Sequence, residues 1–168
     1  MVKKILIALV LALPFSAFAQ KFGVVDLEAI FTAMPETATM QTELTELSNK
    51  YQEEYQKLVE QINKLYSDYQ AIQADTTTPE SIKERRIQEI QEMQQKAEQF
   101  TNTAQQDISR QQNLKMQPIQ AKIQDAVKSV GTEGGYTFIL PNDPAMLMYT
   151  GPDVVDVTAE VRAKLGLK

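Results

Sequence analysis

The chain has 168 residues, with 17 Lys and Arg against 22 Asp and Glu, and it contains neither cysteine nor histidine. The missing residue types exclude disulfides, Ser-His and Cys-His nucleophile systems, and histidine metal sites. A net acidic chain without a long basic run is a poor fit for nucleic acid or an anionic membrane surface. There is also no Gly-rich phosphate loop and no metal-ligand spacing, so we predict that the chain is not an enzyme and needs no cofactor.

Residues 1–19 have the pattern of a cleavable export signal. Lys3 and Lys4 precede an apolar run over residues 5–13, and Ala17-Phe18-Ala19 provides a small-x-small cleavage site. The run is too short to span a bilayer, although an uncleaved N-terminal anchor is the alternative. We predict export, cleavage after Ala19 and no stable membrane insertion. Losing Lys3 and Lys4 leaves 15 basic against 22 acidic residues, a net charge of −7.

A strand and a short helix are expected next. Residues 22–27 form a short apolar run of high strand propensity. Asp26 can cap a short helix that carries Ile30 and Phe31. Pro35 then suits the first turn of a longer helix.

The longest pattern in the chain is a heptad seam. Apolar residues recur every three or four positions, with one four-residue stutter near Tyr51 and Tyr55, and such spacing predicts a coiled-coil helix rather than a strand. A helix of this span is on the order of 55–60 Å long. The seam positions are Met40, Leu44, Leu47, Tyr51, Tyr55, Leu58, Ile62, Leu65, Tyr69 and Ile72.

A second amphipathic helix follows the polar segment 74–80. Thr78 is expected to cap it, with Pro79 at its first position, and it should end at Gly131. A short polar turn between two such helices favours an antiparallel hairpin, with an ordinary two-helix coiled coil of no special role as the alternative. Pro118 breaks the hydrogen-bond ladder of the second helix, which predicts a kink or hinge. Its seam comprises Ile82, Ile87, Ile90, Met93, Ala97, Phe100, Ala104, Ile108, Leu114, Ile119, Ile123, Val127 and Val130.

The C-terminal part is expected to be rich in strands. Residues 136–140 and 145–149 read as a strand and its returning partner, 154–157 as a third extended piece, and Thr158 as the cap of a last helix. The predicted fold is α+β, with a helical hairpin arm (36–130, tip near 74–80) inserted in a small β-rich body (20–35 and 131–168).

A body of this size buries too little surface to stand alone without disulfides, so we expect edge strands to pair between subunits. The sequence leaves the number of subunits open. Candidate oligomerisation residues are Phe22, Val24, Val25, Phe138, Leu140, Met146, Met148 and Val155.

Taken in order, these features resemble the Skp/OmpH family of periplasmic chaperones over residues 20–168. The resemblance rests on the export signal, on KFGVVDLEAIF (21–31), on AMPE (33–36) before a Gln/Glu-rich hairpin, on GGYTFIL (134–140) and on DVT (156–158). It implies a periplasmic homotrimer of "jellyfish" architecture, with three arms around a central cavity. It also implies that unfolded outer-membrane β-barrel proteins are held in that cavity without ATP.

This chain departs from the basic members of that family. Residues 40–130 hold 11 Lys and Arg against 14 Asp and Glu, so we carry over no lipopolysaccharide contact and expect weaker or differently tuned electrostatic capture. Candidate client contacts are Tyr55, Val59 and Tyr66, which widen the seam of the first helix, unless they only complete the packing of the arm. Met93 and Phe100 are added to them as adaptable apolar surface. A structural spacer or tether of the cell envelope is the alternative function.

Overall fold

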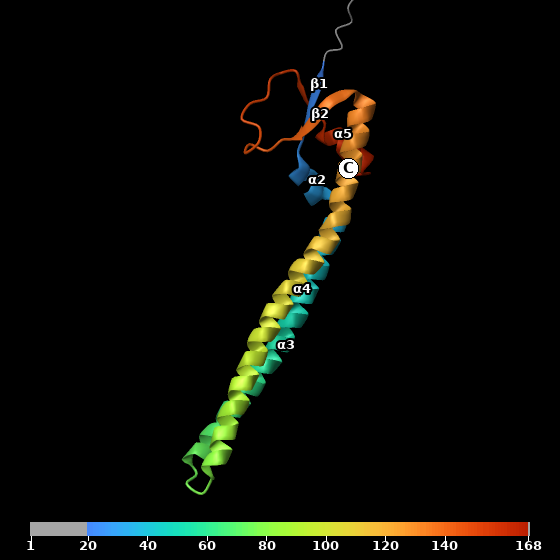
Figure 1. The fold of residues 1–168 in the computed structure, drawn as a ribbon. Helices are drawn as coiled ribbons and strands as arrows, with labels where there is room; N and C mark the ends of the chain where they lie inside the picture. Colours follow the sequence, from blue (N-terminus) through green and yellow to red (C-terminus); the bar gives the residue numbers. More distant parts are fainter. Residues whose placement is uncertain (1–19, 168) are drawn as a thin grey trace, which may run out of the picture. The chain divides into compact units, whose positions relative to one another are not determined.

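The computed structural model describes residues 20–167, and the predicted export signal at 1–19 lies outside them. The α+β class, with two long helices and a small sheet, is confirmed. The described residues form two compact units: a sheet unit of residues 20–30 and 123–167, and a hairpin unit of residues 31–122. In chain order (Figure 1) the elements are β1 (Lys21–Val25), α2 (Leu27–Ala33), α3 (Pro35–Ala74), α4 (Glu80–Gly134), β2 (Tyr136–Pro141), β3 (Val154–Asp156) and α5 (Thr158–Lys164).

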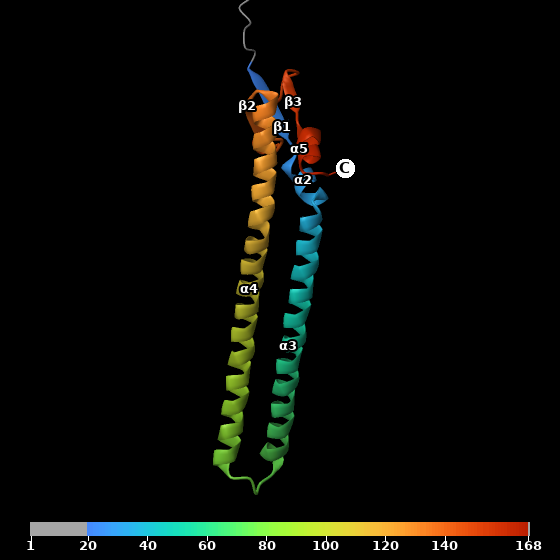
Figure 2. The same ribbon diagram turned by 90° about the vertical axis from the view of Figure 1, so that its right-hand side faces the viewer.

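The sheet unit has β1 at its centre (Figure 2). The strand order is β2-β1-β3 and both pairings are parallel. Val24 lies opposite Leu140 on one side and Asp156 on the other. The pairing continues past the strand ends, because the Asn142 N–H donates to the Val25 carbonyl and the Val157 N–H to the Val24 carbonyl, both at 2.8 Å. The N-terminal strand is therefore held on both sides by the C-terminal segment.

The core of the sheet unit is small and aliphatic. Val25, Ile30, Val157 and Val161 are its fully buried side chains. Asp26 caps α2 as expected, since its Oδ1 accepts a hydrogen bond of 2.8 Å from the Ala29 N–H. A few short elements thus share one apolar cluster.

The hairpin unit is an antiparallel pair of helices, α3 beside most of α4 (Figures 1 and 2). Pro35 occupies the start of α3, as expected. Residues 75–79 separate the helices, and the Asp75 carboxylate accepts hydrogen bonds from the Thr77 N–H and from the hydroxyls of Thr77 and Thr78. The seam expected on α4 is confirmed at its buried positions, which within this unit are Ile90, Ala97, Ala104 and Ile119.

The returning strand predicted at 145–149 was wrong. Within this segment the backbone turns: the Met146 and Leu147 N–H groups donate to the Asp143 carbonyl and the Ala145 N–H to the Asp143 carboxylate, each at 2.8 Å. Local bonding of this kind uses amide groups that a ladder would need. The extended piece predicted at 154–157 does form a strand, β3, which pairs with β1.

Two predicted boundaries were also wrong. The helix expected to end at Gly131 continues to Gly134, where Gly135 takes a left-handed φ of +65° that terminates it. Thr158 is the first residue of α5 rather than its cap, and Val157 occupies the cap position. The start predicted for α4, with Thr78 as its cap and Pro79 as its first residue, was wrong as well: the helix begins at Glu80, and the Thr78 hydroxyl donates to Asp75 at 2.9 Å.

The Thr158 hydroxyl links the ends of β1 and β3, and its removal should destabilise the fold. It accepts a 2.9 Å hydrogen bond from the Asp26 N–H and donates one of 2.5 Å to Asp156 Oδ1. Thr158→Val leaves a partly buried N–H without its acceptor, which lowers the free energy of unfolding by about 1–2 kcal/mol. Urea unfolding followed by circular dichroism measures the loss. Thr158→Ser keeps the hydroxyl and should stay near the unmodified chain; equal losses in both variants would contradict this role.

Candidate functional site

The five predicted client-contact residues all lie in the hairpin unit and all retain accessible surface. Tyr55 is 42% and Tyr66 41% exposed, while Val59, Met93 and Phe100 are half-buried. The Tyr66 hydroxyl accepts a 2.9 Å hydrogen bond from Gln94 Nε2 on the facing helix. The hairpin therefore presents aromatic and aliphatic side chains that its own seam does not cover completely.

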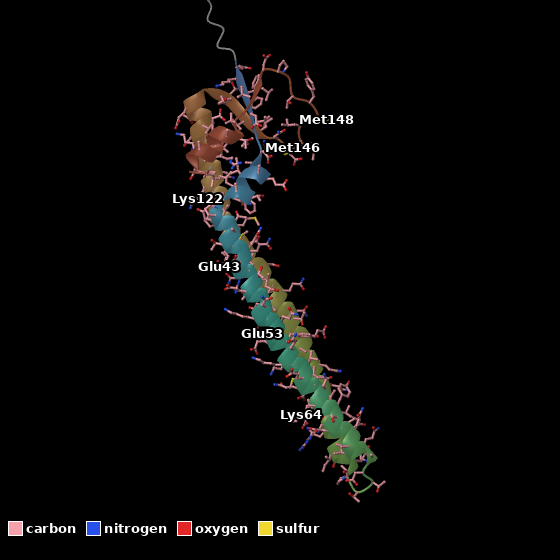
Figure 3. The ribbon with its side chains drawn as sticks, turned by 180° about the vertical axis from the view of Figure 1, so that it is seen from behind. Glu43, Glu53, Lys64, Lys122, Met146 and Met148 are labelled. Carbon is pink, nitrogen blue, oxygen red and sulfur yellow. The ribbon has the colours of Figure 1, made fainter. Side chains whose placement is uncertain are left out.

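Polar contacts between α3 and α4 were not anticipated from the sequence. Lys122 Nζ lies 2.5 Å from Glu36 Oε1, and Lys115 pairs with Glu43 in the same manner. Figure 3 labels Glu43 and Lys122 on the hairpin. Sequence periodicity alone cannot reveal such pairs, because they depend on the register between the two helices.

A further cross-helix contact is a hydrogen bond of 2.9 Å from the Tyr51 hydroxyl to Asp107 Oδ2. Asp107 also pairs with Arg110 on its own helix. The hydrogen bond from Tyr51, and then the Arg110 guanidinium, hold the pKa of Asp107 below its ordinary value of 3.8. The same bond raises the pKa of Tyr51 above 10.0. Tyr51 is thereby fixed in position.

A groove of about 640 Å³ opens beside Tyr51, where the heptad pattern has its stutter. Tyr55, the position that follows the extra step, is 42% exposed, and Ala104 is the buried small residue on the facing helix. The Tyr51 and Phe100 rings meet edge to face, with centroids 5.8 Å apart. We call this feature the stutter groove. It is lined by Ser48, Tyr51, Gln52, Tyr55, Phe100, Thr101, Ala104, Gln105, Ile108 and Ser109.

The candidate oligomerisation residues fall into two groups. Val24 and Val25 are buried in the core of their own sheet unit, so they stabilise the single chain. Phe22 is half-buried and stacks on Phe138 with ring centroids 4.7 Å apart. The remaining candidates are exposed, and Met146 and Met148 stand on the loop after β2 (Figure 3). The exposed candidates are Phe138, Leu140, Met146, Met148 and Val155.

Pro118 lies inside α4, which stays helical on both sides of it. Proline has no N–H to donate to the carbonyl four residues earlier, that of Leu114. The hinge remains a prediction. Within residues 20–167, no helix combines the length and the apolar character needed to cross a membrane.

The Tyr51–Asp107 contact predicts a loss of hairpin stability in acid. Because the pKa of Asp107 is lowered in the folded state, its stabilisation is present above the unfolded value of 3.8 and disappears as the pH falls through the folded pKa. Asp107→Asn should melt a few degrees below the unmodified chain at pH 7, and the two melting curves should converge below about pH 3.8.

Thermal unfolding followed by circular dichroism between pH 7 and pH 3 measures this difference. Asp68→Asn, at an exposed position on α3, is the control and should track the unmodified chain. A gap for Asp107→Asn that stays constant down to pH 3 would rule out its carboxylate as the source.

Comparison with known proteins adds a family to this geometry. The family model described as "Outer membrane protein (OmpH-like)" matches residues 21–165. The chaperone protein Skp of Yersinia enterocolitica is 30% identical over 158 residues, which cover 92% of each chain. The proteins of the same name from Pectobacterium atrosepticum and Photorhabdus luminescens are each 29% identical, over 85% and 86% of this chain and 84% and 88% of their own. The chain belongs to the OmpH-like family.

Proposed function

We propose that this protein is an ATP-independent periplasmic holdase chaperone, which binds unfolded outer-membrane β-barrel proteins and prevents their aggregation in transit. The observation that carries the proposal is the surface of the hairpin, where the side chains of Tyr55, Tyr66 and Met93 remain accessible. Aromatic and methionine side chains adapt to varied partners. The relatives that cover most of the chain carry the name chaperone.

A homotrimer is the proposed assembly. Parallel sheets are ordinarily covered on both faces, yet Phe138, Leu140 and Val155 are exposed in this one. Within residues 20–167, β2 and β3 each leave one edge unpaired, and free edges favour pairing with another chain. These features support an oligomer, and the number three comes from the resemblance to the Skp/OmpH family. Arms from three subunits then enclose one client.

Export completes the proposal. Residues 1–19 have the pattern of an export signal, and we place the mature chain, cleaved after Ala19, in the periplasm. Binding alone is sufficient there, because a holdase lowers the free unfolded population by mass action. Because acidic residues outnumber basic ones on the arm, we do not propose a contact with lipopolysaccharide. A spacer or tether, favoured by the 40 and 55 residues of the two helices, is the alternative.

The native mass of the mature chain tests the function. Alone it should be that of a trimer, and with an outer-membrane β-barrel protein diluted from denaturant it should rise by one client mass while the client stays soluble. Free client without this protein provides the aggregation control. A monomer or dimer, or a trimer that lets the client aggregate, would favour the spacer.

Replacement of Pro118 tests the proposed hinge. Pro118→Ala restores a backbone donor and should stabilise α4 by about 3 kcal/mol, narrowing the distribution of arm positions. Distances between spin labels on different subunits measure that spread, and client affinity measures its consequence. Gln120→Ala, at an exposed position two residues further on, is the control. The hinge is refuted when spread and affinity are both unchanged in Pro118→Ala.

A further inference from the structure

We propose that the stutter groove is a recognition site for uncharged, extended segments of an unfolded client, in which aromatic or aliphatic residues alternate with small polar ones. This inference rests on the proposed holdase function and adds the class of segment that is recognised. It also assigns that recognition to one place on the hairpin.

The first argument is the absence of charge. None of the side chains that line the groove is Lys, Arg, Asp or Glu, although residues 40–130 hold 11 basic and 14 acidic side chains. A second groove on the hairpin, about 340 Å³ beside Pro118, contains the two ion pairs between the helices, Glu36 with Lys122 and Glu43 with Lys115. An unpaired charge buried against the stutter groove would lose its hydration without gaining a partner, so a neutral occupant is favoured.

The second argument is the arrangement of apolar and polar groups. Tyr51, Phe100 and Ile108 supply apolar surface, and the bond from Tyr51 to Asp107 holds one wall in place before anything binds. Gln52 on α3 and Gln105 on α4 are exposed and bring amide donors and acceptors to opposite sides of the groove. An extended chain points successive side chains to opposite faces. Alternate residues can therefore enter the groove while the backbone bonds to the amides.

The third argument is size. A volume of about 640 Å³ lies within the range of about 300–1,000 Å³ that is usual for ligand pockets. It accommodates a few side chains rather than a folded domain. The segments that fit best are those of a transmembrane β-strand, in which lipid-facing apolar residues alternate with others.

Peptide binding to the intact mature protein tests the proposal. The probe is a fluorescent eight-residue peptide with blocked ends, alternating Tyr or Val with Thr; two companions carry Lys or Asp at two of the Tyr or Val positions, whose side chains enter the groove. Fluorescence anisotropy should show the neutral peptide binding about tenfold more tightly than either companion. The double variant Gln52→Glu with Gln105→Glu should weaken the neutral peptide by about tenfold, as should Tyr55→Ala.

The matched control is Gln70→Glu with Gln91→Glu, which adds the same two charges at exposed positions outside the groove, one on each helix. It should leave the affinity unchanged. The proposal is overturned if the neutral peptide does not bind, if the three peptides bind alike, or if the control weakens binding as much as the groove variant. A fall in native mass of the groove variant would also overturn it, because a second copy of the chain would then be the occupant.

Client holding, measured on the same preparations, separates this inference from the proposed function. If the protein still holds clients but the peptide test fails, the groove proposal is rejected and the proposed holdase function stands. Failure of the unmodified protein to hold any client removes the holdase, and the peptide result then decides the groove alone.

Discussion

The fold depends on β1, the central strand of the sheet. Its backbone is hydrogen-bonded on one side to β2 and on the other to β3, and both partners come from the C-terminal segment. Parallel neighbours need a crossover connection, and in this chain the crossover from β1 to β2 contains the whole helical hairpin. Gly23 allows a close approach, since a Cβ on it would lie 3.0 Å from Ile139 Cγ1. One strand thus joins the N-terminal and C-terminal segments in a single sheet, and the long hairpin is inserted between them in the sequence.

The hairpin has a different basis for its stability. Two helices cannot surround a core, so most of the α3 seam is only half-buried, and in the hairpin unit α4 buries only Ile90, Ala97, Ala104 and Ile119 among its apolar side chains. Ion pairs such as that between Glu36 and Lys122 favour one alignment of the two helices, although each exposed ion pair contributes little free energy. Incomplete burial is a consequence of the architecture, and it leaves apolar surface accessible without unfolding anything.

Local patterns could be predicted from the sequence, whereas pairings could not. The seam positions follow from a period of three to four residues, and the Asp26 cap from a neighbouring amide. To predict which residues of the two helices face each other, one must know the residue on which the hairpin is centred. The pairs Glu36 with Lys122 and Tyr51 with Asp107 are both symmetric about residue 79. Centring the turn on residue 77, the middle of the connection 75–79, moves every partner by four residues, about one helical turn. The stutter groove and the ion pairs therefore lay beyond sequence reasoning, as did the turn at Asp143 that replaced a strand.

The central position of β1 also determines the order in which the elements can assemble. Val24 can pair only once Leu140 and Asp156 are present, and these lie more than a hundred residues later in the chain. The helices, built from local contacts, can form first, while the first strand has no partner until the C-terminal segment reaches it. The sheet is thus a late event in folding, and a chain that stops before residue 154 lacks the strand that closes its second side.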